Sequence, residues 1–127
     1  VIKVPTPAIK TNFATNSFAL NKEQRLELQA IAKELIAAQV KAIIVQGHTD
    51  SVGSGKDNKI LSQNRANAIA EYISKFVPGT GFVPIGYGEY KPLVSNATAE
   101  NRAKNRRIRI VILPNLNKFF ALLATDQ

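Results

Sequence analysis

The sequence predicts an α+β fold in which a mixed β-sheet carries its helices on one face, a two-layer α/β sandwich. Two segments with apolar residues at helical spacing lie between short β-branched segments. The last of these β segments alternates apolar and basic residues. A chain of 127 residues with 45% apolar content is also long enough to bury one core. The expected element order is β-α-β-α-β-β.

The first part of the chain contains a short strand and a helix. Residues 8–13 are compatible with a short strand, and a loop at 16–21 follows. Leu28, Ile31 and Leu35 then recur at helical spacing. Asn21 is a good N-cap and Gln24 stands three residues later, the offset of a capping box. We therefore expect a helix from about residue 22 to residue 39.

The remaining elements alternate in the same way. They are a buried strand at 42–45, a polar glycine-rich loop at 47–56, a helix at 58–75, a strand at 82–87, a long polar loop at 88–104 and a strand at 106–113. In the last strand, isoleucines alternate with arginines, so one face is expected to be buried and the other basic. We assign residues 1–114 to one domain and residues 115–127 to a tail with room for one short helix.

The composition excludes several kinds of chemistry. Cysteine is absent, which excludes disulfides and thiolate catalysis. A single histidine, His48, excludes a zinc site built from several imidazoles, and we expect no metal or cofactor. No apolar run reaches the roughly 18 residues of a membrane span. The chain starts at Val1 without a signal-like segment, so we expect a domain of a longer protein. The formal net charge of +8 favours an anionic partner.

The second predicted helix carries polar residues inside its apolar stripe. The stripe is expected to contain the residues Leu61, Ala68, Ile69, Tyr72, Ile73 and Phe76. Arg65 and Asn58 fall in the same arc. A guanidinium held against a core needs an acceptor, and Asp50 in the preceding loop is the nearest candidate. The pattern indicates either a structural Arg–Asp pair or a ligand site beside the start of the helix.

Three other patterns point to functions that we weigh against this site. The run at 53–56 lacks the first glycine and the final hydroxyl residue of a phosphate-binding loop. His48 and Asp50 stand close in sequence, but no nucleophile accompanies them, so we expect no enzyme activity. The basic run at 102–109 suggests nucleic-acid binding or a solvated strand edge. Arg106 differs from Arg107 because its parity places it on the isoleucine face.

A set of spaced residues carries a family resemblance. It comprises Gly47–Gly53, Asn58, Leu61, Ser62, Arg65, Ala66, Gly86–Glu89, Pro92, Asn96, Thr98, Arg102 and Asn105–Arg107. This set resembles the OmpA-like peptidoglycan-binding domain over residues 8–113. One departure is Asn101, where the family commonly has glycine before the arginine.

The resemblance implies non-covalent binding of the peptidoglycan stem peptide, typically at meso-diaminopimelate, by a cell-envelope protein that faces the periplasm or the cell wall. It implies that Asp50 and Arg65, fifteen residues apart, hold the ligand's charged groups, with Asn58 and Leu61 beside them. The remaining expected ligand-binding residues are Thr49, Arg106, Thr15 and Asn16. Any membrane contact would come from a parent protein.

The alternative function is binding of nucleic acid or another anionic polymer through the basic surface. A salt titration separates the two, because nucleic-acid binding weakens steeply with salt. A pocket that holds a zwitterion responds weakly. The sequence leaves open the parent protein, the oligomeric state and the diamino acid that is bound.

Overall fold

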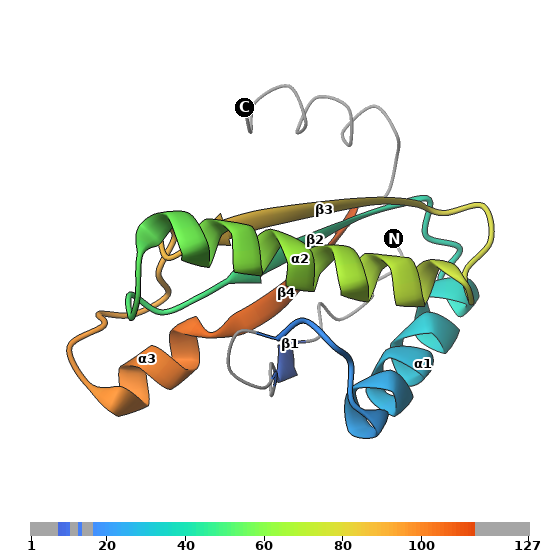
Figure 1. The fold of residues 1–127 in the computed structure, drawn as a ribbon. Coiled ribbons are helices and arrows are strands. Elements are labelled where there is room, and N and C mark those ends of the chain that lie inside the picture. The colour runs from blue at the N-terminus through green and yellow to red at the C-terminus, as the bar shows by residue number, and fades with distance from the viewer. Residues whose placement is uncertain (1–7, 11–12, 14–16, 114–127) are drawn as a thin grey trace.

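The computed structural model describes residues 8–10, 13 and 17–113. Its elements are β1 (Ala8–Lys10), α1 (Lys22–Ala37), β2 (Ala42–His48), α2 (Gly55–Ser74), β3 (Gly81–Gly88), α3 (Ala99–Asn105) and β4 (Arg107–Leu113) (Figure 1). Thr15, Asn16 and the tail at 115–127 lie outside the described residues.

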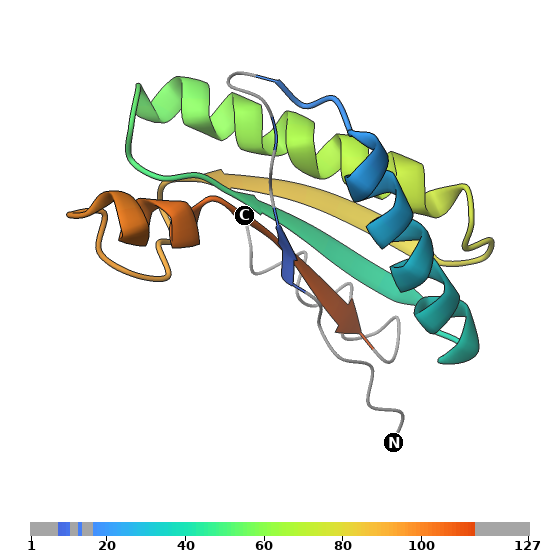
Figure 2. The ribbon, with the colours of Figure 1, turned by 90° about the horizontal axis from the view of Figure 1, so that it is seen from below.

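The four described strands form one mixed sheet in the order β1-β4-β2-β3. β2 and β3 are parallel, whereas β4 runs antiparallel to both β2 and β1. Helices α1 and α2 cover one face of the sheet, as two views show (Figures 1 and 2). This confirms the predicted two-layer α+β architecture. The carboxyl ends of β2 and β3 and the start of β4 meet at one edge, where ligands bind in many open sheets.

The core lies between the two long helices and the sheet. The predicted apolar residues of α1, Leu28, Ile31 and Leu35, are buried there against Ile43 and Ile110 of the sheet. The capping box at the start of α1 is also confirmed. The main-chain nitrogen of Gln24 donates to Asn21 Oδ1 over 2.7 Å, and that of Asn21 donates to Gln24 Oε1 over 2.9 Å.

The prediction of a loop throughout residues 88–104 was wrong in its second half, because α3 begins at Ala99. Thr98 caps this helix, accepting a hydrogen bond from the main-chain nitrogen of Asn101 over 3.1 Å. The helix has only seven residues and carries no apolar stripe, so it leaves no periodic signal. The observed order is therefore β-α-β-α-β-α-β.

The buried face of α2 is rotated from the predicted stripe. Ala70, which lies outside the predicted stripe, is buried, whereas Tyr72, which lies inside it, is only half-buried. The cause is a close approach to the sheet at two glycines. A Cβ on Gly47 would overlap the main-chain oxygen of Ser62, and one on Gly86 would overlap the main chain of the neighbouring Gln63. A helix this close to the sheet turns its small residues toward the strands. A prediction from the positions of large apolar residues does not detect this.

Candidate ligand-binding site

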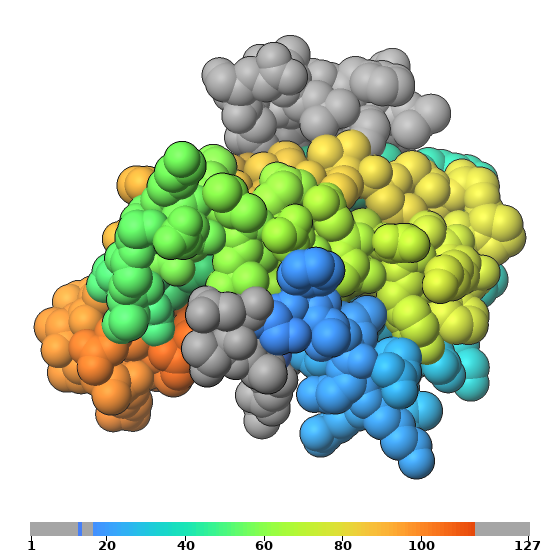
Figure 3. All heavy atoms as spheres, viewed as in Figure 1, coloured from blue at the N-terminus to red at the C-terminus, as the bar shows by residue number. Residues whose placement is uncertain are grey.

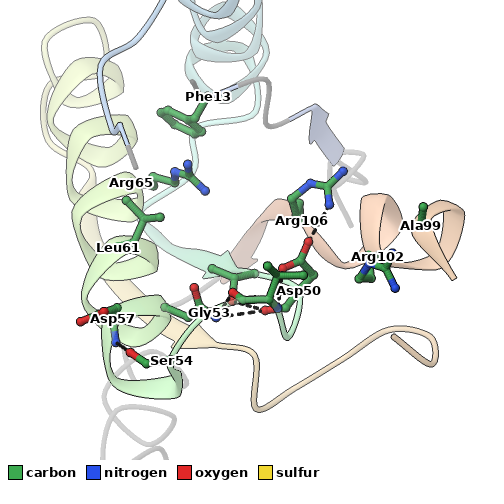
Figure 4. Close-up of a pocket in the computed structure, with 13 residues that line it drawn as sticks. Phe13, Asp50, Gly53, Ser54, Asp57, Leu61, Arg65, Ala99, Arg102 and Arg106 are labelled. Carbon is green, nitrogen blue, oxygen red and sulfur yellow. Dashed lines mark hydrogen bonds and ion pairs between the residues drawn. The ribbon is translucent and has the colours of Figure 1, made fainter. Parts of the chain in front are cut away.

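A pocket of about 680 Å³ opens at the edge of the sheet where β2 and β3 end. The first turns of α2 form one wall and α3 forms the other (Figure 4). The space-filling view shows these two parts of the chain, green and orange, at the same end of the molecule (Figure 3). The loop that joins β2 to α2 forms the floor, and Phe13 lines the pocket from the N-terminal segment.

Asp50 is the fixed anion of the pocket floor. It lies two residues after the end of β2 and is only 7% exposed. Its Oδ1 accepts a hydrogen bond from the main-chain nitrogen of Val52 over 3.0 Å, and its Oδ2 accepts from Arg106 Nη1 over 2.6 Å. Thr49 is buried beside it and donates its hydroxyl to the Asp50 carbonyl oxygen over 2.9 Å. The carboxylate is therefore held in one orientation before any ligand arrives.

Arg65 is the buried cation on the α2 wall. It is 8% exposed, and its Nε donates to the carbonyl oxygen of Ser17 over 2.9 Å. Its Cζ lies 4.8 Å from the centre of the Phe13 ring. Burial and the nearby Arg106 lower the pKa of Arg65, and Asp50 opposes them. A guanidinium nevertheless stays protonated in proteins, so a positive charge faces the pocket.

The ion partner of Asp50 differs from the one that the sequence suggested. Arg65 was the candidate, but the ion pair at 2.6 Å joins Asp50 to Arg106, which is 56 residues away in the chain. Arg65 acts on Asp50 as a nearby charge instead. The predicted site residue Arg106 thus lies in the pocket with its side chain 46% exposed.

Asn58 and Leu61 complete the α2 wall. Asn58 is buried, and its Nδ2 donates to the carbonyl oxygens of Val52, over 2.9 Å, and Asp50, over 3.3 Å. This amide therefore holds the loop that carries Asp50. Leu61 is half-buried and adds an apolar surface next to Arg65 (Figure 4). The structure brings together all six predicted site residues that it describes.

The opposite wall was missed as a binding surface by the sequence interpretation. Arg102 lines the pocket from α3 and donates through Nη1 to the carbonyl oxygen of Asn96 over 3.0 Å. The wall is fixed by Asn105, which is 0% exposed. Its side chain accepts from the main-chain nitrogens of Leu93 and Val94 and donates to the carbonyl oxygen of Val94 and to Asn96 Oδ1, all over 2.8–3.1 Å. In the sequence, the signal for this wall was Asn105, an uncharged residue within the basic run at 102–109.

The pocket suits recognition of a small charged group. Charges of both signs line it, from two aspartates and three arginines. The described residues contain no group of three side chains able to hold a metal ion. None of the helices described is long and apolar enough to cross a bilayer.

Comparison with known proteins then decides the family. The model of the OmpA family matches residues 12–106. The chain belongs to the OmpA family. It is 33% identical over 104 residues to outer-membrane lipoprotein YfiB of Pseudomonas aeruginosa, covering 81% of this chain and 62% of that protein. It is 40% identical over 86 residues to peptidoglycan-binding protein ArfA of Mycobacterium tuberculosis, covering 67% and 26%.

A similar solved structure agrees with this assignment. The peptidoglycan-associated lipoprotein of Burkholderia pseudomallei superposes with a TM-score of 0.71 at 26% identity, covering 84% of this chain and 89% of that one. The chain spans less than two thirds of the length of both YfiB and ArfA. The resemblance identified from the spaced residues is thus confirmed at the level of the family.

Proposed function

We propose that this OmpA-family domain binds the stem peptide of peptidoglycan non-covalently, at the diamino acid meso-diaminopimelate, and so anchors a cell-envelope protein to the wall. One observation carries the proposal: a buried carboxylate, Asp50, and a buried guanidinium, Arg65, line the same pocket. Two relatives named as peptidoglycan-binding protein and peptidoglycan-associated lipoprotein support the ligand class. Relatives named for the outer membrane agree with a location in the cell envelope.

The two charges match the free end of diaminopimelate, which bears an ammonium and a carboxylate on one carbon. Asp50 accepts two hydrogen bonds from the described residues, and an ionised carboxylate has about four acceptor sites. It can therefore accept from the ligand ammonium. Arg65 faces the ligand carboxylate with the planar fork that suits it. Leu61 and Phe13 supply apolar surface beside these charges, which strengthens both contacts by excluding water.

This arrangement would also discriminate between ligands. A neutral or singly charged side chain in the pocket would displace water from Asp50 and Arg65 but contact at most one of the two with an opposite charge. Losing one charge contact of this kind in a desolvated site costs about 2–5 kcal/mol. Specificity for a zwitterion then comes from the penalty on the wrong ligand as much as from attraction to the right one.

Calorimetry with a soluble diaminopimelate-containing stem peptide tests the proposal. We expect Asp50→Ala and Arg65→Ala each to weaken binding by about thirtyfold or more, because each removes one partner of a desolvated charge pair. The losses in the double variant should not add, since both act through one bound zwitterion. Glu100→Gln and Arg109→Gln are matched controls, because each removes the same charge from an exposed side chain outside the pocket.

Circular dichroism on each variant separates a lost site from a lost fold. Wild-type affinity in a folded Asp50→Ala variant would contradict the site. Unfolding of both single variants would instead assign these charges a structural role.

Binding of an anionic polymer has one observation in its favour. Arg107, Arg109 and Lys91 have no carboxylate partner within 4.0 Å among the described residues. A salt titration of wall binding separates the two functions. Binding through the pocket should change little between 50 and 200 mM salt, whereas binding through several surface cations should fall by orders of magnitude.

A further inference from the structure

The pocket carries one positive charge more than the diaminopimelate end group requires. Its described lining residues include the arginines 65, 102 and 106 and the aspartates 50 and 57. A bound ammonium and carboxylate together add no net charge. One cation would therefore remain uncompensated after the end group has bound, in a partly desolvated site where charge is costly.

The excess positive charge lies on the α3 wall. Asp50 already neutralises Arg106, but no carboxylate of the described residues lies within 4.0 Å of Arg102. Arg102 donates from Nη1 to the neutral carbonyl oxygen of Asn96. A guanidinium has five N–H donors, so Arg102 keeps donors for a ligand. Figure 4 places Arg102 on the same side of Asp50 as α3, across the pocket from Arg65 and Leu61.

The α3 wall is also rigid enough to act as a binding subsite. Arg102 and Arg106 lie one helical turn apart, since the main-chain nitrogen of Arg106 donates to the carbonyl oxygen of Arg102 over 3.2 Å. Asn105 anchors this turn to the 93–96 segment through its four side-chain hydrogen bonds. Two arginines held this way lose less freedom on binding than arginines on a mobile surface.

We propose that Arg102, with Arg106 beside it, forms a second carboxylate subsite that binds a further free carboxylate of the same stem peptide. The residue attached to diaminopimelate in such stems is a glutamate whose second carboxyl group is either free or amidated. The domain would then select stems in which this group is free. Because the ligand is the one proposed above, this inference rests on the proposed function.

Two tripeptides that differ only in amidation of the glutamate carboxyl group provide the test. We expect the wild-type domain to bind the free acid about tenfold more tightly, the effect of one charge-assisted contact. Arg102→Gln should bind the free acid about tenfold more weakly and the amidated peptide as the wild type does. Lys104→Gln removes the same charge from an exposed position of α3 outside the pocket, and it should keep the full preference.

Ala99→Asp is a second variant that does not depend on removing Arg102. Ala99 is exposed in the first turn of α3, three residues before Arg102, and it lines the same wall. A carboxylate at the start of a helix is tolerated or favourable, so the variant should fold. It should neutralise Arg102 and reduce the preference for the free acid to less than threefold.

The outcomes distinguish the two proposals. Equal affinity of the wild type for both tripeptides would overturn the second subsite and leave the proposed function standing. An Arg102→Gln variant that loses affinity for both peptides equally would assign Arg102 a purely structural role, again overturning the subsite. Failure of the wild type to bind either tripeptide would overturn the proposed function and the subsite together.

Discussion

The basic run at 102–109 divides between two very different surfaces of the molecule. Arg102 and Arg106 line the pocket, where Asp50 pairs with Arg106. Arg107 and Arg109 lie on the opposite side of β4, where no carboxylate accompanies them among the described residues. The Arg107 side chain donates to two main-chain oxygens, that of Asn105 over 3.3 Å and that of Lys91 over 3.2 Å. Position around the pocket, not the local charge density in the sequence, separates these two groups of arginines.

His48 shows how strongly positive that outer surface is. It lies opposite Arg107 in the β2–β4 register and stacks on Tyr87 with a centroid separation of 5.3 Å. The side chain is 4% exposed, and its buried Nδ1 has no hydrogen-bond partner among the residues that the structure describes. Burial, followed by the charges of Arg107, Arg109 and Lys91, lowers the pKa of His48 to about 4. The imidazole is therefore neutral at physiological pH and serves packing.

We expect the largest effect on stability from Gly47→Ala, on the face of the sheet that packs against α2. The added Cβ would overlap the main chain of α2 at Ser62 and push the helix away from β2. We expect the free energy of unfolding to fall by about 3 kcal/mol or more in urea titration. Gly81→Ala is the control, because its Cβ would meet only the Lys41 carbonyl oxygen at 3.8 Å. An equally stable Gly47→Ala variant would mean that the close approach does not shape the pocket wall.

Asn105→Ala tests whether the α3 wall, unlike the outer face of β4, positions the site. It removes four hydrogen bonds of a fully buried side chain and leaves the loop's polar groups without those partners. We expect a loss of about 2–3 kcal/mol in unfolding free energy. Stem-peptide affinity should fall by about tenfold, because the adjacent Arg106 loses its support. Asn101→Ala on the same helix should change neither measurement, since its side chain makes no hydrogen bond to the described residues. Unchanged peptide affinity in the Asn105 variant would show that α3 does not position the site.

Acid should weaken the fold through His48. The pKa of His48 is lower in the folded state than its ordinary 6.5, so the unfolded chain binds more protons between the two values. The stabilisation is complete above about pH 6.5 and is lost as the pH falls towards about 4. The upper limit of this loss is about 3 kcal/mol. Urea titrations from pH 7 to pH 4 measure it, and His48→Gln should flatten that part of the profile. If the unfolding free energy of His48→Gln depended on pH as steeply as that of the wild type, His48 would not be the group responsible.

The smallest effect on the ligand should come from the outer face itself. Arg107→Gln and Arg109→Gln should leave stem-peptide affinity within about twofold of wild type, because neither side chain lines the pocket. Both should raise the pKa of His48 by removing a cation, and NMR titration reads this directly because the chain has a single histidine. They should also reduce adhesion to anionic wall polymers at low salt. A tenfold loss of peptide affinity in either variant would show that the outer face takes part in peptide binding.

Local patterns were sufficient to locate the long elements and the centre of the site. Helix α1 followed from Leu28, Ile31 and Leu35 together with the capping box, because periodicity and capping are properties of neighbouring residues. Arg65 stood out because a guanidinium in an apolar stripe demands a partner, and the structure places it in the pocket. By contrast, α3 was missed because seven residues without an apolar stripe produce no detectable period.

The sequence by itself determined the two-layer α+β class, the capping of α1 and the presence of a charged site around Asp50, Asn58 and Arg65. Only the tertiary structure decided that Asp50 pairs with Arg106, which two packed strands bring together across 56 residues. It also decided the rotation of α2, which depends on glycines in two other elements. Ion-pair choice and helix contact follow from distances in space, and a linear pattern carries those distances only within a single helix or strand.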